Sequence, residues 1–235
     1  MFLKKSNLLK YNTYQGRKVS KKLSSNKLEI LRNFYTSYSY DEQIIKHLNS
    51  KNFKNKFRLP RGKFNKINIE IGFGDGEFLL QNAISKPKEL FIGIEVYING
   101  IAKVLENINK LGMQNLILSN LNCLYFLQAL PNDSIDKIYI INPDPWIKKR
   151  HHKRRLINHE NIKLFTQITK KRNEIYITTD SKIYLQHIKA LFIEHNDFYR
   201  KAKIQKLKEN DNLYNISRYQ RKAMKNGEKI YLINI

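Results

Sequence analysis

Residues 67–76 read Ile-Asn-Ile-Glu-Ile-Gly-Phe-Gly-Asp-Gly, an alternating apolar run that leads directly into three glycines within five positions. The alternation predicts a β-strand, and residues 77–85 can form a helix after the glycine turn. Glycine at such a turn tolerates positive φ angles and lets the backbone approach a ligand closely. We therefore interpret the segment as a strand, a ligand-binding turn and a helix, the first unit of an α/β fold. The alternative is an ordinary strand-to-helix turn.

The rest of the chain repeats this alternation of strands and helices. Further strands are predicted at 90–94, 116–118, 138–141, 174–179 and 230–233. Apolar residues at helical spacing predict helices near 28–35, 98–108, 162–168 and 188–192. A charged stretch, 201–228, precedes the last predicted strand. The alternation predicts a mostly parallel, twisted sheet with helices on both faces.

The length of 235 residues suits one α/β domain with a sizeable core and is short for two. Residues 1–65 are basic and polar, and the pattern of strands and helices begins at residue 66. We therefore expect a basic, partly ordered N-terminal extension at 1–65 and a single enzyme domain at 66–235.

The chain is strongly basic. It has 44 Lys and Arg against 20 Asp and Glu, a net charge of +24. Such a charge attracts the phosphates of nucleic acid or an anionic membrane surface. Lys, Asn and Ile are abundant throughout, so a compositional bias explains the scattered lysines. It does not explain the dense basic block at 148–155.

Cysteine content and hydropathy indicate the cellular compartment in which the protein works. Cys123 is the only cysteine, which excludes an intrachain disulfide and a zinc site built from several cysteines. A reducing compartment fits this usage. No apolar stretch approaches the ~20 residues that cross a bilayer, and the N-terminus lacks the long apolar segment of a secretion signal. We expect a cytoplasmic protein without a membrane span.

Glu95 stands at the end of the second predicted strand, where a carboxylate typically accepts hydrogen bonds from ribose hydroxyls. Taken alone, this fits either a dinucleotide or another cofactor that contains adenosine. A dinucleotide fingerprint needs glycine at position 77, where this chain has Glu77, and Asp75 and Glu77 would repel a pyrophosphate. S-adenosylmethionine carries a cationic centre and no phosphate. We therefore favour it as the cofactor, with Glu70 near its charged amino-acid end.

A second motif follows the predicted strand at 138–141. Residues 142–155 read Asn-Pro-Asp-Pro-Trp-Ile-Lys-Lys-Arg-His-His-Lys-Arg-Arg. Asp144 lies between two prolines, whose fixed φ angles pre-organise the acid just beyond the C-terminal end of the strand. The basic block behind it contains no acid and suggests a polyanionic substrate whose phosphates it holds. The alternative is a solvated basic loop with an incidental turn Asp.

Other side chains of this loop leave alternatives open. Trp146 can stack on a base or pack in the core. His151 and His152 are adjacent, and on a cationic loop we expect them to extend an anion-binding surface rather than hold a metal. The predicted phosphate-binding residues are Lys149, Arg150, Lys153, Arg154 and Arg155.

Several of these segments together resemble the bacterial tRNA (guanine-N7)-methyltransferases. The segments are Ile69 to Phe78, Gly93 to Val96, Pro143 to Trp146 and Lys148 to Arg155, with further likeness at Gln15-Gly16-Arg17, Thr179-Asp180 and Ser217 to Arg221. The resemblance covers roughly residues 14–235. The stretch at 143–155 is highly specific, whereas the glycine turn is shared by many methyltransferases.

The resemblance implies a Rossmann-like class I methyltransferase fold. It also implies S-adenosylmethionine as methyl donor, tRNA as partner, and N7 of a guanine in the tRNA variable loop as acceptor. By position, the cofactor-binding residues are Glu70, Gly72, Gly74, Gly76, Glu95 and Asn122, and the catalytic residue is Asp144. The substrate-binding positions are Lys148, Asp180, Ser217, Arg218, Tyr219 and Gln220.

Four positions depart from the family pattern. Asn122 replaces a usual Asp and can still hydrogen-bond an adenine edge. Ser217 replaces Thr and keeps the hydroxyl. Gln220 replaces an expected Glu, which removes a charge, and Asn142 replaces the aromatic residue often found before the proline. Asp180 has a second interpretation, the N-cap of the following helix.

Chemistry assigns Asp144 a role other than proton abstraction. Guanine N7 has an exposed lone pair and no proton, so its methylation needs no obligatory general base. A carboxylate can instead accept two adjacent N–H groups of guanine's Watson–Crick edge, which selects guanine over adenine and orients N7. It also stabilises the positive charge that develops on the base. Holding N7 in line with the methyl group can lower the activation free energy by up to ~7–11 kcal/mol, as in favourable intramolecular models.

Two other functions stay open. One is an S-adenosylmethionine-dependent methyltransferase for an exocyclic amine of RNA or DNA, since such enzymes share the Asn-Pro loop position but often carry Pro-Pro and an aromatic residue there. The other is a non-catalytic RNA-binding protein with a Rossmann-like core, which the intact glycine turn and Glu95 disfavour. We expect a monomer or homodimer.

Overall fold

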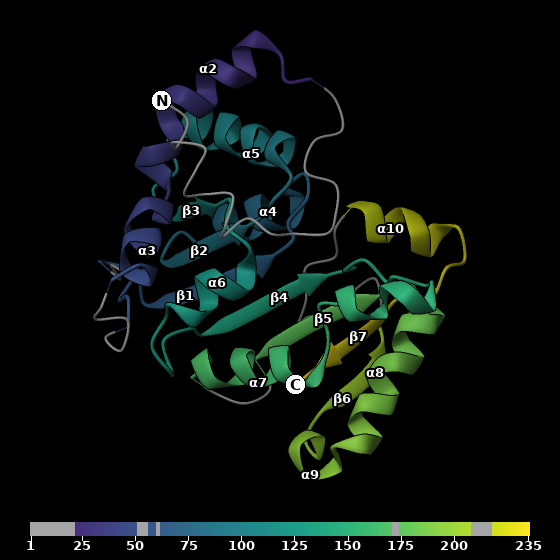
Figure 1. Cartoon of the computed structure of the whole chain (residues 1–235). Coiled ribbons are helices and arrows are strands. Elements are labelled where there is room, and N and C mark those ends of the chain that lie inside the picture. Colours follow the sequence, from purple (N-terminus) through teal and green to yellow (C-terminus); the bar gives the residue numbers. More distant parts are fainter. Residues whose placement is uncertain (1–21, 51–55, 60–61, 171–173, 208–217) are drawn as a thin grey trace.

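The computed structural model describes residues 22–50, 56–59, 62–170, 174–207 and 218–235. Its centre is a seven-stranded sheet with the order β3-β2-β1-β4-β5-β7-β6 (Figure 1). The strands are β1 (Lys66–Ile71), β2 (Glu89–Ile94), β3 (Leu116–Ser119), β4 (Lys137–Ile141), β5 (Ile175–Thr179), β6 (Lys203–Lys206) and β7 (Tyr231–Asn234). The first five run parallel, whereas β7 is antiparallel to both β5 and β6. The predicted α/β fold with a mostly parallel sheet is confirmed.

Helices cover both faces of this sheet. They are α2 (Ser25–Phe34), η1 (Tyr35–Tyr38), α3 (Asp41–Leu48), α4 (Glu77–Ser85), α5 (Ile98–Leu111), α6 (Cys123–Gln128), η2 (Lys149–Arg154), α7 (His159–Ile168), α8 (Lys182–Glu194), α9 (Asn196–Tyr199) and α10 (Arg218–Lys225). On one face α3, α6, α7 and α8 pack against the isoleucines of β1, β4 and β5. On the other, α2, α4 and α5 cover β2 and β3, and α10 packs over β4, β5 and β7.

The chain adds strands in two directions from β1, which creates a topological switch point between β1 and β4. β2 and β3 follow on one side of β1, and β4 and β5 continue on the other. Ile71 of β1 is level with Ile94 of β2 and Ile140 of β4. The residues that follow these strands therefore emerge together at one edge, where open α/β sheets bind their ligands.

The described part of the N-terminal region packs onto this fold. The predicted helix near 28–35 is present as α2, which lies against α5 and buries Leu31. Ile44 of α3 is fully buried in the core cluster that also contains the isoleucines of β1, β4 and β5. Residues 22–50 thus belong to the packed structure, and the boundary at residue 65 stays a prediction.

Several elements lie where the sequence showed no clear pattern, among them α6, β6 and α10. The short helix α6 is N-capped by Asn122, whose Oδ1 accepts the Leu124 N–H at 2.9 Å. β6 and α10 both fall in the charged stretch 201–228. β6 is a mostly exposed edge strand, so it needs no alternation of apolar and polar residues. Within the described ranges no helix is long and apolar enough to cross a membrane.

Candidate active site

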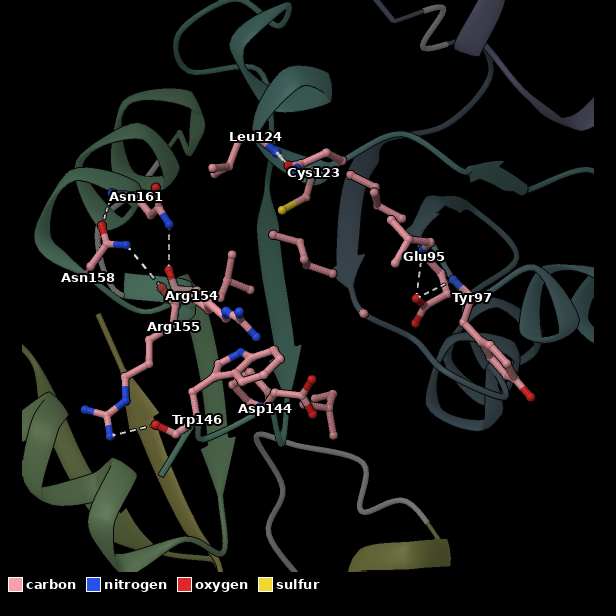
Figure 2. Close-up of a pocket in the computed structure, with 18 of the residues that line it drawn as sticks. Glu95, Tyr97, Cys123, Leu124, Asp144, Trp146, Arg154, Arg155, Asn158 and Asn161 are labelled. Atoms are coloured by element: carbon pink, nitrogen blue, oxygen red, sulfur yellow. Dashed lines mark hydrogen bonds between the residues drawn. The ribbon is translucent and has the colours of Figure 1, made fainter. Parts of the chain in front are cut away.

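A pocket of about 560 Å³ opens at the switch point, beyond the ends of the parallel strands (Figure 2). One half is formed by Gly72 and by Glu95 to Tyr97, which follow β1 and β2. The other half is formed by Asn142 to Asp144 with Trp146, which follow β4. Residues 121–124 lie between the two halves, and Lys153 to Leu156, Asn158 and Asn161 complete the wall. The two motifs singled out in the sequence therefore face one cavity.

The glycine turn divides into two parts with different roles. Gly72 and Gly74 have φ angles of 74° and 54°, and a Cβ on either would meet nothing within 4 Å in the described structure. Gly76 also has a positive φ, but a Cβ there would lie 2.0 Å from Val104 Cγ2 on α5. Gly72, which lines the pocket, is thus open to a ligand. Gly74 has free space beside it but does not line the pocket, and Gly76 permits close packing of α5 on the start of α4.

Backbone N–H groups hold the Glu95 carboxylate in place. Oε2 accepts the Gly74 N–H at 2.8 Å, and Oε1 accepts the N–H groups of Val96 and Tyr97 at 2.7 and 2.9 Å. A carboxylate has about four acceptor sites, so Oε2 keeps one for a ligand hydroxyl. Burial raises the pKa of Glu95, these N–H groups oppose that rise, and the charge of Asp144 adds to it.

Glu70 lies on β1 beneath the turn and does not line the pocket. Its side chain is 2% exposed, and within the described residues its Oε2 has no hydrogen-bond partner. Burial, reinforced by the charge of Glu95, raises the pKa of Glu70 well above its usual range. A buried acid without a partner is costly, and a cationic ligand group would relieve that cost. These residues therefore fit a cofactor with a charged amino-acid end and a ribose.

Asn122 and Cys123 line the wall between the halves of the pocket. The Asn122 Oδ1 is engaged as the cap of α6, as described above. Burial raises the pKa of the Cys123 thiol to about 12. The thiol is therefore protonated at neutral pH and is a poor nucleophile.

The loop that carries Asp144 is tied down by Arg155. The Arg155 side chain is buried, its Nε donates to the Pro145 carbonyl at 2.9 Å, and its guanidinium lies over the Tyr184 ring. Asp144 itself is exposed at the pocket (Figure 2). The sequence grouped Arg155 with the phosphate-binding residues. Its contacts with loop carbonyls instead favour a role in holding the Pro145–Trp146 turn.

Trp146 lines the pocket and is half-buried, so it is not a core residue. Its backbone is left-handed, with φ 42°. The Arg154 guanidinium lies 5.1 Å from the centre of its ring, and the His151 ring meets it edge-on at 5.6 Å. Arg154 and Lys153 line the pocket, while Lys148, Lys149 and Arg150 are exposed on η2 and just before it.

The remaining predicted substrate residues lie at the end of β5 and in α10. Asp180 follows β5, and the N-cap of α8 is Ser181, whose side chain accepts the Tyr184 N–H. The capping interpretation of Asp180 is therefore wrong. Gln220 is fully buried and donates from Nε2 to Thr178 Oγ1 at 3.0 Å.

Some predicted residues cannot be placed at the site. Ser217 and the Gln15–Arg17 motif lie outside the described residues, and Arg218 and Tyr219 are described only as the backbone that begins α10. Conversely, Asn158 and Asn161 of the α7 start line the pocket unpredicted, since an Asn before a helix indicates no more than a cap. Across the described ranges, no three His, Cys, Asp or Glu residues gather as a metal site.

Comparison with known proteins gives these features a family context. Residues 65–233 match the family described as "Putative methyltransferase". The tRNA (guanine-N(7)-)-methyltransferase of Bartonella henselae is 33% identical over 215 residues, which are 90% of this chain and 90% of that protein. The Wolbachia pipientis protein of the same name is 29% identical and covers 83% of this chain. The bifunctional methyltransferase of Rickettsia felis is 35% identical over 91% of this chain, and the chain spans 38% of its length.

Solved structures share the fold at low identity. An antibiotic-related methyltransferase superposes with a TM-score of 0.52 at 18% identity, over 77% of this chain and 95% of its own. The 16S rRNA methyltransferase KamB also gives 0.52, at 11% identity, over 74% and 89%. These structures share only the fold. The match over residues 65–233 and the relative from Bartonella henselae place the chain in the family of bacterial tRNA (guanine-N(7)-)-methyltransferases.

Proposed function

We propose that the protein transfers the methyl group of S-adenosylmethionine to N7 of a guanine in tRNA, with residues 66–235 as the methyltransferase domain. The observation that carries this proposal is the shared pocket. Gly72 and Glu95 form one side of it and Asp144 the other. Cofactor and acceptor base would therefore meet within a single cavity, as a direct transfer requires.

The side of the pocket nearer β1 and β2 suits the cofactor. Glu95 keeps one acceptor position for a ribose hydroxyl, and Gly72 allows the backbone to approach the ligand. Glu70 lies behind the pocket wall, two residues before Gly72, and its buried carboxyl without a partner at Oε2 would favour a positive charge nearby. When bound, S-adenosylmethionine supplies an activated methyl group.

Asp144 suits the acceptor base. Its carboxylate can accept the two adjacent N–H groups on guanine's Watson–Crick edge, which leaves N7 free for the incoming methyl group. No residue needs to remove a proton, because N7 carries none. The negative charge of Asp144 stabilises the base as it becomes cationic. Pro143, Pro145 and Arg155 hold this carboxylate ready before the substrate arrives.

The basic block suits the tRNA backbone. Lys148, Lys149 and Arg150 are exposed beside the pocket, and Lys153 and Arg154 line it. Phosphate contacts of this kind position an RNA without reading its sequence. The variable loop as the modified region follows from family resemblance. A cytoplasmic location and a monomeric or dimeric state stay predictions.

Nucleoside analysis tests the proposal. Unmodified tRNA is incubated with radiolabelled S-adenosylmethionine and the protein, then digested and separated. We expect the label in 7-methylguanosine. Label in a nucleoside methylated on an exocyclic amine would favour the first rival function.

Calorimetry with S-adenosylmethionine tests the second rival. A methyltransferase binds the cofactor without RNA. Absence of binding, together with retained tRNA affinity, would favour an RNA-binding protein without turnover.

A further inference from the structure

Asn142, the first residue after β4, has an unpaired donor beside the proposed acceptor site. Its backbone is left-handed, with φ 45°, and the residue lines the pocket two positions before Asp144. Its Nδ2 atom is shielded from water, and in the described structure it has no hydrogen-bond partner. A buried amide donor of this kind needs an acceptor. An oxygen atom of a ligand in the pocket can supply it.

The orientation of this amide is set by Thr178 on the neighbouring strand β5. The Thr178 hydroxyl is fully buried and accepts two N–H groups, from the Asn142 backbone at 3.2 Å and from Gln220 Nε2 at 3.0 Å. A hydroxyl has two acceptor lone pairs and a single proton. With both lone pairs engaged, that proton goes to Asn142 Oδ1, 3.0 Å away.

This network fixes which end of the Asn142 amide remains for a ligand. Because Oδ1 faces Thr178, the NH₂ group is the end left without a protein partner. Gln220 is compatible with this arrangement, since its amide donates to Thr178 and does not compete for the hydroxyl proton through that atom. A carboxylate at position 220 would accept the proton instead. The Asn142 amide would then turn over, donate to Thr178 and present its oxygen to the ligand.

We propose that Asn142 is a specificity-determining residue that donates from Nδ2 to O6 of the acceptor guanine, with Thr178 and Gln220 as its positioning residues. This inference rests on the proposed function. Asp144 offers acceptors for the N–H groups of guanine, and O6 is the acceptor that adjoins them on the same edge. A donor and a carboxylate in one loop together complement guanine. Adenine, with an amino group in place of O6, would set two donors against each other.

The test compares acceptor bases in wild-type protein and in variants at position 142. The substrates are tRNAs that carry guanosine or 2,6-diaminopurine riboside at the acceptor position alone. Diaminopurine has an amino group in place of O6, lacks the N1 proton and keeps N7, and the N1 change is the same for every protein compared. Asn142→Leu removes the donor and Asn142→Asp replaces it by an acceptor. We expect both to lower kcat/KM on guanine about 10- to 100-fold, as loss of one buried hydrogen bond does. The guanine-to-diaminopurine ratio falls in both, and furthest in Asn142→Asp.

A pair of substitutions outside the pocket tests the positioning network. Gln220→Glu should turn the Asn142 amide and lower the base ratio. Gln220→Met removes the donor to Thr178 but leaves the hydroxyl proton for Asn142. It should retain more of the guanine preference than Gln220→Glu. A merely structural role of Gln220 predicts equal ratios in both variants and would overturn the positioning assignment. Thermal unfolding checks that each variant is folded.

Cofactor affinity separates the two possible oxygen acceptors. The carboxylate of S-adenosylmethionine has the same acceptor chemistry as guanine O6. We expect its Kd, measured by calorimetry, to stay the same in Asn142→Leu. A weakened Kd with an unchanged base ratio would assign the donor to the cofactor and overturn the proposal. If an active Asn142 variant keeps the wild-type guanine-to-diaminopurine ratio, the role proposed for Asn142 is rejected, while the proposed function is not affected. Absence of N7 methylation by the wild type rejects the proposed function and this inference with it.

Discussion

Ser119 Oγ donates a 2.6 Å hydrogen bond to Asp41 Oδ1 across 78 positions of the chain. The other oxygen of Asp41 accepts from the Tyr35 hydroxyl at 2.6 Å and from the Asn120 N–H at 2.9 Å. The Asn120 side chain in turn donates to the carbonyl of Glu95 at 2.9 Å. A carboxylate from the N-terminal region is thereby linked to the cofactor side of the pocket.

Replacing Asp41 by Ala should weaken both the fold and the cofactor site. The change leaves buried hydroxyls of Tyr35 and Ser119 without their acceptor, which costs about 1–3 kcal/mol for each unsatisfied group. Denaturant unfolding should show the loss, and calorimetry should show weaker S-adenosylmethionine binding. Wild-type stability in the variant would mean that water replaces the carboxylate. Glu42→Ala, the exposed neighbour of Asp41, is the matched control.

Glu70 should make stability and cofactor binding depend on pH. Burial, followed by the charge of Glu95, raises its pKa well above the usual value, so the folded state holds a proton that the unfolded state has already lost. The free energy of unfolding therefore falls as pH rises from the unfolded pKa toward the folded one. Glu70→Gln should remove this fall in denaturant titrations at several pH values. An identical pH profile in the variant would locate the effect elsewhere.

The same carboxyl should release a proton when a cationic ligand binds. A nearby positive charge favours the ionised form. Calorimetry of S-adenosylmethionine binding in buffers of different ionisation enthalpy should detect the released proton in the wild type and not in Glu70→Gln. Equal proton release in both proteins would exclude Glu70 as the partner of the cationic group.

Asp144 should be required for transfer rather than for tRNA binding. Asp144→Asn keeps the shape of the side chain but loses the charge and one acceptor. We expect kcat to fall at least about a hundredfold, as for removal of a preorganised electrostatic group. The Kd for tRNA, measured by filter binding, should change little because phosphate contacts supply most of the affinity. Wild-type rates would show that the role assigned to Asp144 is incorrect.

Lys148 and Lys149 should contribute to the salt dependence of tRNA binding. Each phosphate contact contributes roughly 0.7–0.9 to the slope of log K against log salt concentration. Replacing both residues by Ala should weaken binding and reduce that slope. Lys110→Ala, on an exposed part of α5 away from the pocket-lining residues, is the control and should leave the slope as it was. An unaltered slope in the double variant removes both lysines from the phosphate-binding set.

Arg155 should act on the loop and not on phosphate. Its Nε bond to Pro145 predicts that Arg155→Ala lowers kcat by loosening the Asp144 turn while the salt slope of tRNA binding stays unchanged. If Arg155→Ala reduced the salt slope of tRNA binding as much as the lysine variant does, Arg155 would be a phosphate-binding residue, as the sequence predicted. The two measurements together distinguish these roles.

The sequence predicted the parallel part of the sheet because its strands are short, buried and apolar. Ile69, Ile92 and Ile138 are fully buried, and burial of such a side chain contributes about 1.5–3 kcal/mol. The pattern therefore reflects the dominant stabilising force. Hydropathy did not predict β6 and α10, because both lie in the charged stretch 201–228. β6 is held by backbone pairing at a sheet edge, and such pairing leaves no mark in side-chain hydropathy.

The site was predictable where motifs carry the backbone geometry. Glycines and prolines in the turns before α4 and around Asp144 marked both halves of the pocket. Contacts between distant segments were not predictable. The family resemblance singled out Gln220 and Asn142 as expected departures, but only the structure shows that both hydrogen-bond the same Thr178 hydroxyl. Arg154 and Arg155 are adjacent in the basic block but make different contacts. Arg154 lies over the Trp146 ring, whereas Arg155 donates to the Pro145 carbonyl. This difference depends on how the loop folds back and was likewise not predictable.

Substitution of a single atom in the substrate tests the central claim most directly. A tRNA transcript that carries 7-deazaguanosine only at the acceptor position has a C–H where guanine has N7 and keeps the Watson–Crick edge that Asp144 is proposed to hold. We predict that this transcript binds the protein with nearly unchanged affinity and accepts no methyl group from S-adenosylmethionine, while the guanosine transcript is methylated. Equal methylation of the two transcripts would contradict N7 as the acceptor.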